Sequence, residues 1–156
     1  MKFWWEDFNP QKHKEIDKWR SSDIDNFAMF GESLSKQALW YRKNKLGKDA
    51  DFIKIVSTPD QIVAFMILNL SGRELGINPI VVNPTLIGKG YGKEVLLELI
   101  GNYREILGVQ IDVLSANISM NNIKSIKFFE SLGFTLNKLN DDKDFGSYVK
   151  QTGKPE

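Results

Sequence analysis

The segment that most restricts the fold of this chain is NPTLIGKGYGKEVLLELI, which runs from residue 83 to residue 100. Gly88, Gly90 and Gly92 occupy alternate positions, and apolar residues at helical spacing follow directly, as far as Gly108. Glycines accept unusual backbone angles, and here they precede a helix start with its unpaired N–H groups and partial positive charge. The segment therefore indicates an anion site at a helix N-terminus, with a tight turn that has no ligand as the competing interpretation.

The same segment does not match two common phosphate-binding motifs. A P-loop requires Gly, four residues and then Gly-Lys-Ser/Thr, but Ile87 stands at the first glycine and Glu94 follows Gly92-Lys93. The dinucleotide motif G-x-G-x-x-G would require a third glycine where the chain has Lys93. A phosphate site here must belong to another family of folds.

Periodicity and turn residues predict the other elements. Strands are expected over residues 1–9, 51–57, 61–70, 77–83, 109–116, 134–139 and 145–150, which are rich in β-branched and aromatic residues. Helices are expected over residues 10–20, 24–45, about 91–107 and 123–132. The order is β-α-α-β-β-β-α-β-α-β-β, with hairpins beside one strand-helix-strand crossover. It predicts a single α+β domain over residues 1–156, with helices flanking a mixed, mostly antiparallel sheet.

The composition restricts the class of protein. The 156 residues are 42% hydrophobic and 26% charged, as in a soluble globular domain, and 21 Lys and Arg against 20 Asp and Glu leave a net charge of +1. That balance argues against a nucleic-acid or membrane-surface partner. The N-terminal residues soon turn acidic, and no apolar run approaches the ~18 residues of a membrane span, so a cytoplasmic location is expected.

The inventory of side chains excludes several kinds of site. The chain has no cysteine, which excludes disulfides, thiolate metal sites and cysteine nucleophiles. His13 is the only histidine, so a His-rich metal site cannot form, and no metal is expected. Because His13 lies in a charged, helix-like run, we expect its side chain to be solvated at the surface.

Two motifs resemble those of the GNAT family of N-acetyltransferases. The family motif Val-x-Pro followed by Gln/Arg-x-x-Gly-x-Gly/Ala is similar to VNPTLIGKGYG, with Val82, Pro84, Gly90 and Gly92 at the matching positions. A second motif, Asn-x-x-Ala-x-x-x-Tyr-x-x-x-Gly-Phe, is similar to NIKSIKFFESLGF, which begins at Asn122. The predicted order of elements is also that of the family, so the resemblance covers the whole chain.

The resemblance implies that acetyl-CoA is the cosubstrate. Backbone amides from Gly88 to Lys93 would hold its diphosphate, and the main chain of residues 80–82 would bind the amide groups of its pantetheine arm, in a gap beside the strand over 109–116. Asn122 would contact that arm or only cap its helix. The residues implied in cofactor binding are Ile80, Val81, Val82, Ile87, Gly88, Lys89, Gly90, Tyr91, Gly92, Lys93, Asn122 and Phe129.

The chain departs from the family pattern at two positions. Ile87 replaces the usual Gln or Arg, and Phe129 replaces a tyrosine that protonates the departing CoA sulfur in the family. Phe129 cannot donate a proton, and Tyr148 on the last strand is a distant alternative. Asp112, a carboxylate inside an apolar strand, is the candidate general base, with a solvent-facing side chain as the competing interpretation.

The region around the glycines also resembles the aminoglycoside 6′-N-acetyltransferases. Those enzymes carry aspartates where this chain has Asn78 and Asn117, and aspartates pair with the ammonium groups of a polycation. We therefore expect N-acetylation of an unidentified, less cationic small-molecule amine. The alternatives are a non-catalytic acetyl-CoA-binding sensor module and a peptide or protein N-acetylase, and the exposed strands of this architecture allow a homodimer.

Overall fold

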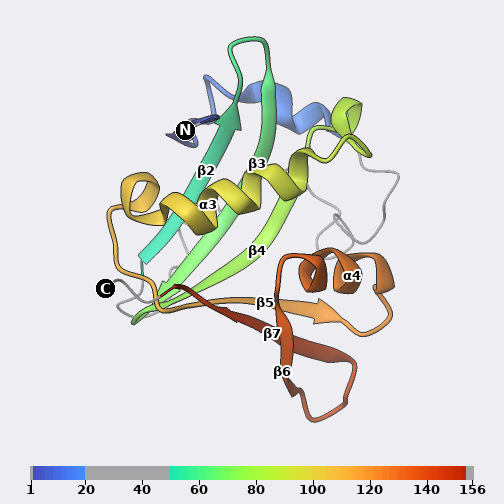
Figure 1. Cartoon of the computed structure of the whole chain (residues 1–156). Helices are drawn as coiled ribbons and strands as arrows, with labels where there is room; N and C mark the ends of the chain where they lie inside the picture. Colours follow the sequence, from blue (N-terminus) through green and yellow to red (C-terminus); the bar gives the residue numbers. More distant parts are fainter. Residues whose placement is uncertain (1, 20–49, 154–156) are drawn as a thin grey trace.

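A computed structural model describes residues 2–19 and 50–153 (Figure 1). Within these ranges seven strands form one mixed sheet in the order β1-β2-β3-β4-β5-β7-β6. Every neighbouring pair is antiparallel except β4 and β5, which run parallel on either side of the α3 crossover. The predicted α+β class and mostly antiparallel sheet are confirmed. The helix predicted over residues 24–45 lies outside the described residues.

The described elements have the following bounds. The strands are β1 (Trp4–Asp7), β2 (Ala50–Ser57), β3 (Ile62–Ser71), β4 (Glu74–Val82), β5 (Val113–Ser119), β6 (Thr135–Leu139) and β7 (Phe145–Gln151). The helices are α3 (Tyr91–Leu107) and α4 (Ile123–Ser131), with the 3-10 turns η1 (Lys14–Lys18) and η2 (Pro84–Leu86). Among these residues no helix has the length and apolarity needed to cross a membrane.

Two predicted elements differ from the observed ones. A helix is predicted over residues 10–20, but the described part of this range, up to residue 19, holds a turn and the short η1. The Asn9 side chain accepts the N–H groups of Gln11 and Lys12 and so stabilises a tight turn there. The strand predicted over residues 109–116 begins only at Val113. Gly108 ends α3 in the left-handed conformation, and residues 109–112 are needed to return the chain to the sheet.

The central strand β3 is buried on both faces over residues 62–68, which explains its nearly continuous apolar run. On one face α3 and α4 cover a core that includes Met66, Leu75 and Leu99. On the other face a second core joins η1 to the sheet through Ile16, and Phe65 of β3 is part of it. Alternation along β3 and β4 divides their side chains between these two cores.

β4 and β5 share a short ladder and then separate. Glu74, Leu75 and Gly76 pair with residues 113–115, whereas the rest of β4 pairs with β3 and the whole of β5 pairs with β7. A bulge at residues 78–79, opposite Ile67, bends β4 beyond this ladder. Figure 1 shows the two strands diverging, with the start of α3 above the far end of β4 and α4 beside the far end of β5.

Candidate functional site

A cavity of about 360 Å³ lies where the start of α3, the end of β4 and one side of α4 meet. The predicted cofactor residues that line it are Ile80, Val82, Ile87, Gly88, Gly90, Tyr91, Gly92, Lys93 and Phe129. The structure thus gathers most of the predicted set around one opening. The cavity is also lined by Leu86, Lys124, Ser125 and Phe128, which the sequence reasoning missed.

The three glycines are required for two different physical reasons. Gly88 and Gly90 both have φ +84°, and a Cβ at either would meet no atom of the described residues beyond its chain neighbours within 4 Å, so backbone conformation requires glycine there. Gly92 is required because of close packing and not because of its backbone conformation. A Cβ on this residue would lie 3.3 Å from Val82 Cγ2 and 3.7 Å from the Phe128 ring, so its bare backbone allows α3 to approach β4 and α4 closely.

The start of α3 presents free N–H groups to the cavity. The first intrahelical bond runs from the Glu94 N–H to the Gly90 carbonyl oxygen at 3.2 Å, and no side chain among the described residues caps the helix. The N–H groups of residues 91–93 therefore have no partner within the helix. Lys93 and Lys124 also line the cavity, and both side chains are exposed. Helix polarity and two ammonium groups together make the opening favourable for an anion.

The end of β4 provides a second set of unpaired backbone groups. The Asn83 N–H donates to the Val63 carbonyl oxygen at 2.8 Å, and the register pairs Val82 with Ala64. Alternation in an antiparallel ladder then directs the main-chain groups of Ile80 and Val82 away from β3, into the gap left by β5. Val81 was predicted to bind the cofactor as well. By the same alternation its main chain faces β3, and its side chain is buried in the second core.

α4 supplies the remaining wall. Asn122 caps this helix by accepting the Ser125 N–H at 3.1 Å, and it does not line the cavity. Phe129 lines the cavity and stacks edge-on against Phe128 and Phe134, with ring centroids 5.3 and 5.1 Å apart. Lys124 and Phe128 are four residues apart and share a face, a spacing that could have identified them once the facing side of α4 was known.

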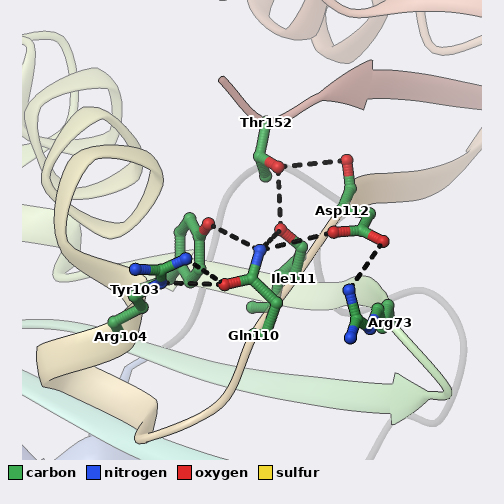
Figure 2. A network of polar contacts seen from close by, with 7 residues as sticks. All are labelled: Arg73, Tyr103, Arg104, Gln110, Ile111, Asp112 and Thr152. Carbon is green, nitrogen blue, oxygen red and sulfur yellow. Dashed lines mark hydrogen bonds and ion pairs between the residues drawn. The ribbon is translucent and has the colours of Figure 1, made fainter. Parts of the chain in front are cut away.

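Asp112 lies far from this cavity, beside Arg73 and Gln110 (Figure 2). It precedes β5, beside the ladder at Glu74, whereas Ile80 and Val82 lie six to eight residues further along β4, about 20–26 Å at ~3.3 Å per residue. Its carboxylate pairs with Arg73 at 3.5 Å and is half exposed. The expectation that Asp112 sits inside a strand is wrong, and its position does not support a role as general base.

The two other polar candidates are in structural positions. Tyr148 is buried in the core beneath α3 and α4 and does not line the cavity. His13 is buried and not solvated as expected, and its ring stacks on Phe8. Its Nδ1 accepts the Asn9 N–H at 2.9 Å and its Nε2 lies 2.6 Å from Glu6 Oε1, so both ring nitrogens are engaged.

Glu6 completes this small network. Hydrogen bonds from His13 and then Lys12 hold the pKa of the Glu6 carboxyl below its ordinary value, against a smaller opposing effect of burial. The contacts join β1 to η1 on the face of the sheet that carries the second core. Their role is to fix the N-terminal segment.

Comparisons with known proteins agree with this geometry. The model of the acetyltransferase (GNAT) family matches residues 4–134. The uncharacterized N-acetyltransferase YfmK of Bacillus subtilis (strain 168) is 28% identical over 131 residues, 84% of each chain.

Solved structures of similar fold are also acetyltransferases. Spermidine N-acetyltransferase from Vibrio cholerae, in complex with CoA and spermine, superposes with a TM-score of 0.73 at 15% identity and covers 97% of this chain and 96% of its own. The N-acetyltransferase PseH of Campylobacter jejuni, in complex with acetyl coenzyme A, superposes with a TM-score of 0.68 at 19% identity. The match covers 97% of this chain and 99% of the PseH chain. These likenesses show the fold, and the family match extends over most of the chain. This chain therefore belongs to the acetyltransferase (GNAT) family.

Proposed function

We propose that this protein transfers an acetyl group from acetyl-CoA to an amine of a small molecule. The observation that carries the proposal is the cavity, in which the uncapped start of α3, the free main-chain edge of β4 and two lysines face one space. An anionic head and an amide-bearing arm would each find a matching partner there. The family assignment supports the same chemistry.

The residues present fit acetyl-CoA. The N–H groups of residues 91–93, with Lys93 and Lys124, would hold the diphosphate. The positive φ of Gly88 and Gly90 shapes the turn in front of them. The main chain of Ile80 and Val82 would bind the amides of the pantetheine arm, as an added strand binds to a sheet edge. When bound, acetyl-CoA supplies an activated thioester.

Phe129 sets the limit on acid catalysis at this site. The transfer forms a C–N bond, breaks the C–S bond and releases one proton from the amine. Phe129 has no proton to give to the sulfur, although a thiol with a pKa of about 8.5 is a tolerable leaving group as the thiolate. Loss of a general acid typically costs ~10²–10⁴-fold in rate. We therefore expect a slow enzyme. The same missing acid favours the second candidate function, an acetyl-CoA-binding module without turnover.

The acceptor would reach the thioester from the sheet face opposite α3. On β5, Asn117 is exposed and alternates with the buried Ala116 and Ile118, so it points to that face. Ser147 of β7 pairs with it. These neutral polar groups support an acceptor with hydroxyl or amide substituents and few charges.

A turnover assay tests the proposal. The full chain is incubated with acetyl-CoA and a panel of amines that includes spermidine, amino sugars, kanamycin, amino acids and a peptide with a free N-terminus, and release of CoA thiol is followed. We expect acetylation of a weakly cationic small amine. Rapid acetylation of kanamycin would contradict the acceptor class, and tight acetyl-CoA binding without any turnover would establish the sensor module instead.

A further inference from the structure

The sheet consists of two halves joined by a short hinge. β1 to β4 form one half, and β5, β7 and β6 form the other. In the described structure the two are paired through Glu74, Leu75 and Gly76 with residues 113–115. The gap that would take the pantetheine arm opens directly beyond this ladder. The angle at the ladder therefore sets the width of the gap.

Residues 110–112 gather polar contacts from three parts of the fold around this hinge, which are the β3–β4 turn, the end of α3 and the residue after β7 (Figure 2). The N–H of Asp112 donates to the Arg73 carbonyl oxygen at 2.8 Å, which joins the β3–β4 turn to the start of β5. Gln110 extends the network to the last turns of α3. Its Oε1 accepts from Arg104 Nε at 2.8 Å, and its Nε2 lies 3.4 Å from the Tyr103 hydroxyl and 3.3 Å from the carbonyl oxygen of Ile111.

Thr152, the residue directly after β7, closes the network. Its side chain is buried, and its hydroxyl lies 2.7 Å from the Ile111 carbonyl oxygen and 3.1 Å from that of Asp112. Its N–H donates to the Asp112 carbonyl oxygen at 2.9 Å. One residue thus holds two consecutive carbonyl groups of the segment that connects α3 to β5. None of these atoms lines the cavity.

From this arrangement we infer that Thr152, assisted by Gln110, is a positioning residue for the opening between β4 and β5. It holds residues 111–112 in place, and the N–H of Asp112 makes the hydrogen bond to Arg73 that joins the two halves of the sheet. The inference rests on the proposed function. Ile80 and Val82 lie four to six residues beyond Gly76, about 13–20 Å along the strand. Over about 15 Å, a rotation of about 4° at the hinge moves the wall of the gap by about 1 Å, and a displacement of that size can cost ~10²-fold in catalysis. Loosening the hinge should therefore weaken contacts to the arm and leave the phosphate site at the start of α3 intact.

The test distinguishes weaker binding of the pantetheine arm from weaker binding of the phosphates. Thr152→Val keeps the shape and removes the hydroxyl, and Thr152→Ser is the matched control that keeps it. Calorimetry measures the binding of two ligands, CoA and 3′-phosphorylated ADP, which is CoA without its pantetheine arm. Where a ligand binds too weakly for direct titration, its affinity is measured by displacement. We expect Thr152→Val to weaken CoA binding at least 5-fold while the nucleotide changes less than 2-fold, and Thr152→Ser to match the parent for both.

A second variant guards against misfolding of the first. Gln110→Met preserves length and removes every contact of the Gln110 amide, and it should produce the same selective loss. Equal weakening of both ligands, or no weakening of either, in the folded variants would overturn the positioning role. Failure of the parent to bind CoA would instead contradict the proposed function, so the two failures are distinguishable.

Discussion

Gly92 of α3 lies directly against Val82 of β4, and a Cβ atom on Gly92 would stand 3.3 Å from Val82 Cγ2. The same Cβ atom on Gly92 would lie 3.7 Å from the ring of Phe128 in α4. Three elements, β4, α3 and α4, therefore meet at a residue without a side chain. This contact places the first turn of α3 beside the free edge of β4, which is the relationship that the proposed cofactor site needs.

A bulkier residue at this position should disrupt that contact. Gly92→Val is expected to lower the free energy of unfolding by about 1–3 kcal/mol, because the added methyl groups overpack the space beside Val82. Gly101→Ala is the matched control in the same helix, since a Cβ there meets nothing within 4 Å. It should raise the free energy of unfolding by about 0.5–1 kcal/mol through helix propensity. Urea unfolding followed by circular dichroism measures both, and equal effects of the two changes would contradict the packing argument.

The contact between Glu6 and His13 predicts an acid dependence of stability. The folded state lowers the pKa of Glu6 below the value of 4.5 expected for the unfolded chain, so the unfolded state binds the proton first as the pH falls. The stabilisation is present above about pH 4.5 and is lost as the pH falls through the folded-state pKa. Glu6→Gln should reduce stability at pH 7 and make its decline below pH 4.5 shallower.

Glu15→Gln controls for the loss of one carboxylate. Glu15 is exposed in the same N-terminal segment. Its substitution should leave the acid dependence of thermal unfolding close to that of the parent. If Glu6→Gln retained the full acid dependence of the parent, the stabilising role of the contact with His13 would be refuted.

A hydroxyl restored at Phe129 should accelerate the reaction. The Phe129 ring lines the cavity, so Phe129→Tyr adds an acid beside the site where the thiolate would leave. We expect the single-turnover rate of acetyl transfer to rise about 10-fold or more, toward the ~10²–10⁴-fold that a well-placed general acid typically contributes. Phe128→Tyr adds the same group to the neighbouring ring and should give no such gain. A rate that stays unchanged in Phe129→Tyr would show that this ring serves packing alone.

The parts of the site predicted from sequence are those that local chemistry specifies. The glycine run, the periodicity of α3 and the capping Asn122 each depend on residues close in the chain, and each was found where expected. The strand predicted over residues 61–70 is likewise found, as β3 at Ile62–Ser71. Such features depend on backbone conformation and spacing, which a sequence displays directly.

The parts that were missed depend on tertiary contacts. His13 sits among charged neighbours, and its burial arises from Phe8 and Glu6, which reach it only once β1 and η1 have packed together. Asp112 continues the alternation of a strand, yet hydrogen bonds to Arg73 and Thr152 hold it in the connection before β5. Lys124 lines the cavity because of the rotation of α4, which periodicity alone does not fix.

The measurement that tests the central claim most directly is calorimetric titration of the protein with acetyl-CoA, repeated on Lys93→Glu. Reversing one charge near a phosphate changes the interaction by about 2 kcal/mol in water, so the variant should bind at least 10-fold more weakly. Lys127→Glu makes the same change of charge on an exposed side of α4 outside the cavity and should bind like the parent. Tight binding that only Lys93→Glu weakens would support the cavity as the acetyl-CoA site. No binding by the parent, or equal weakening in both variants, would contradict it.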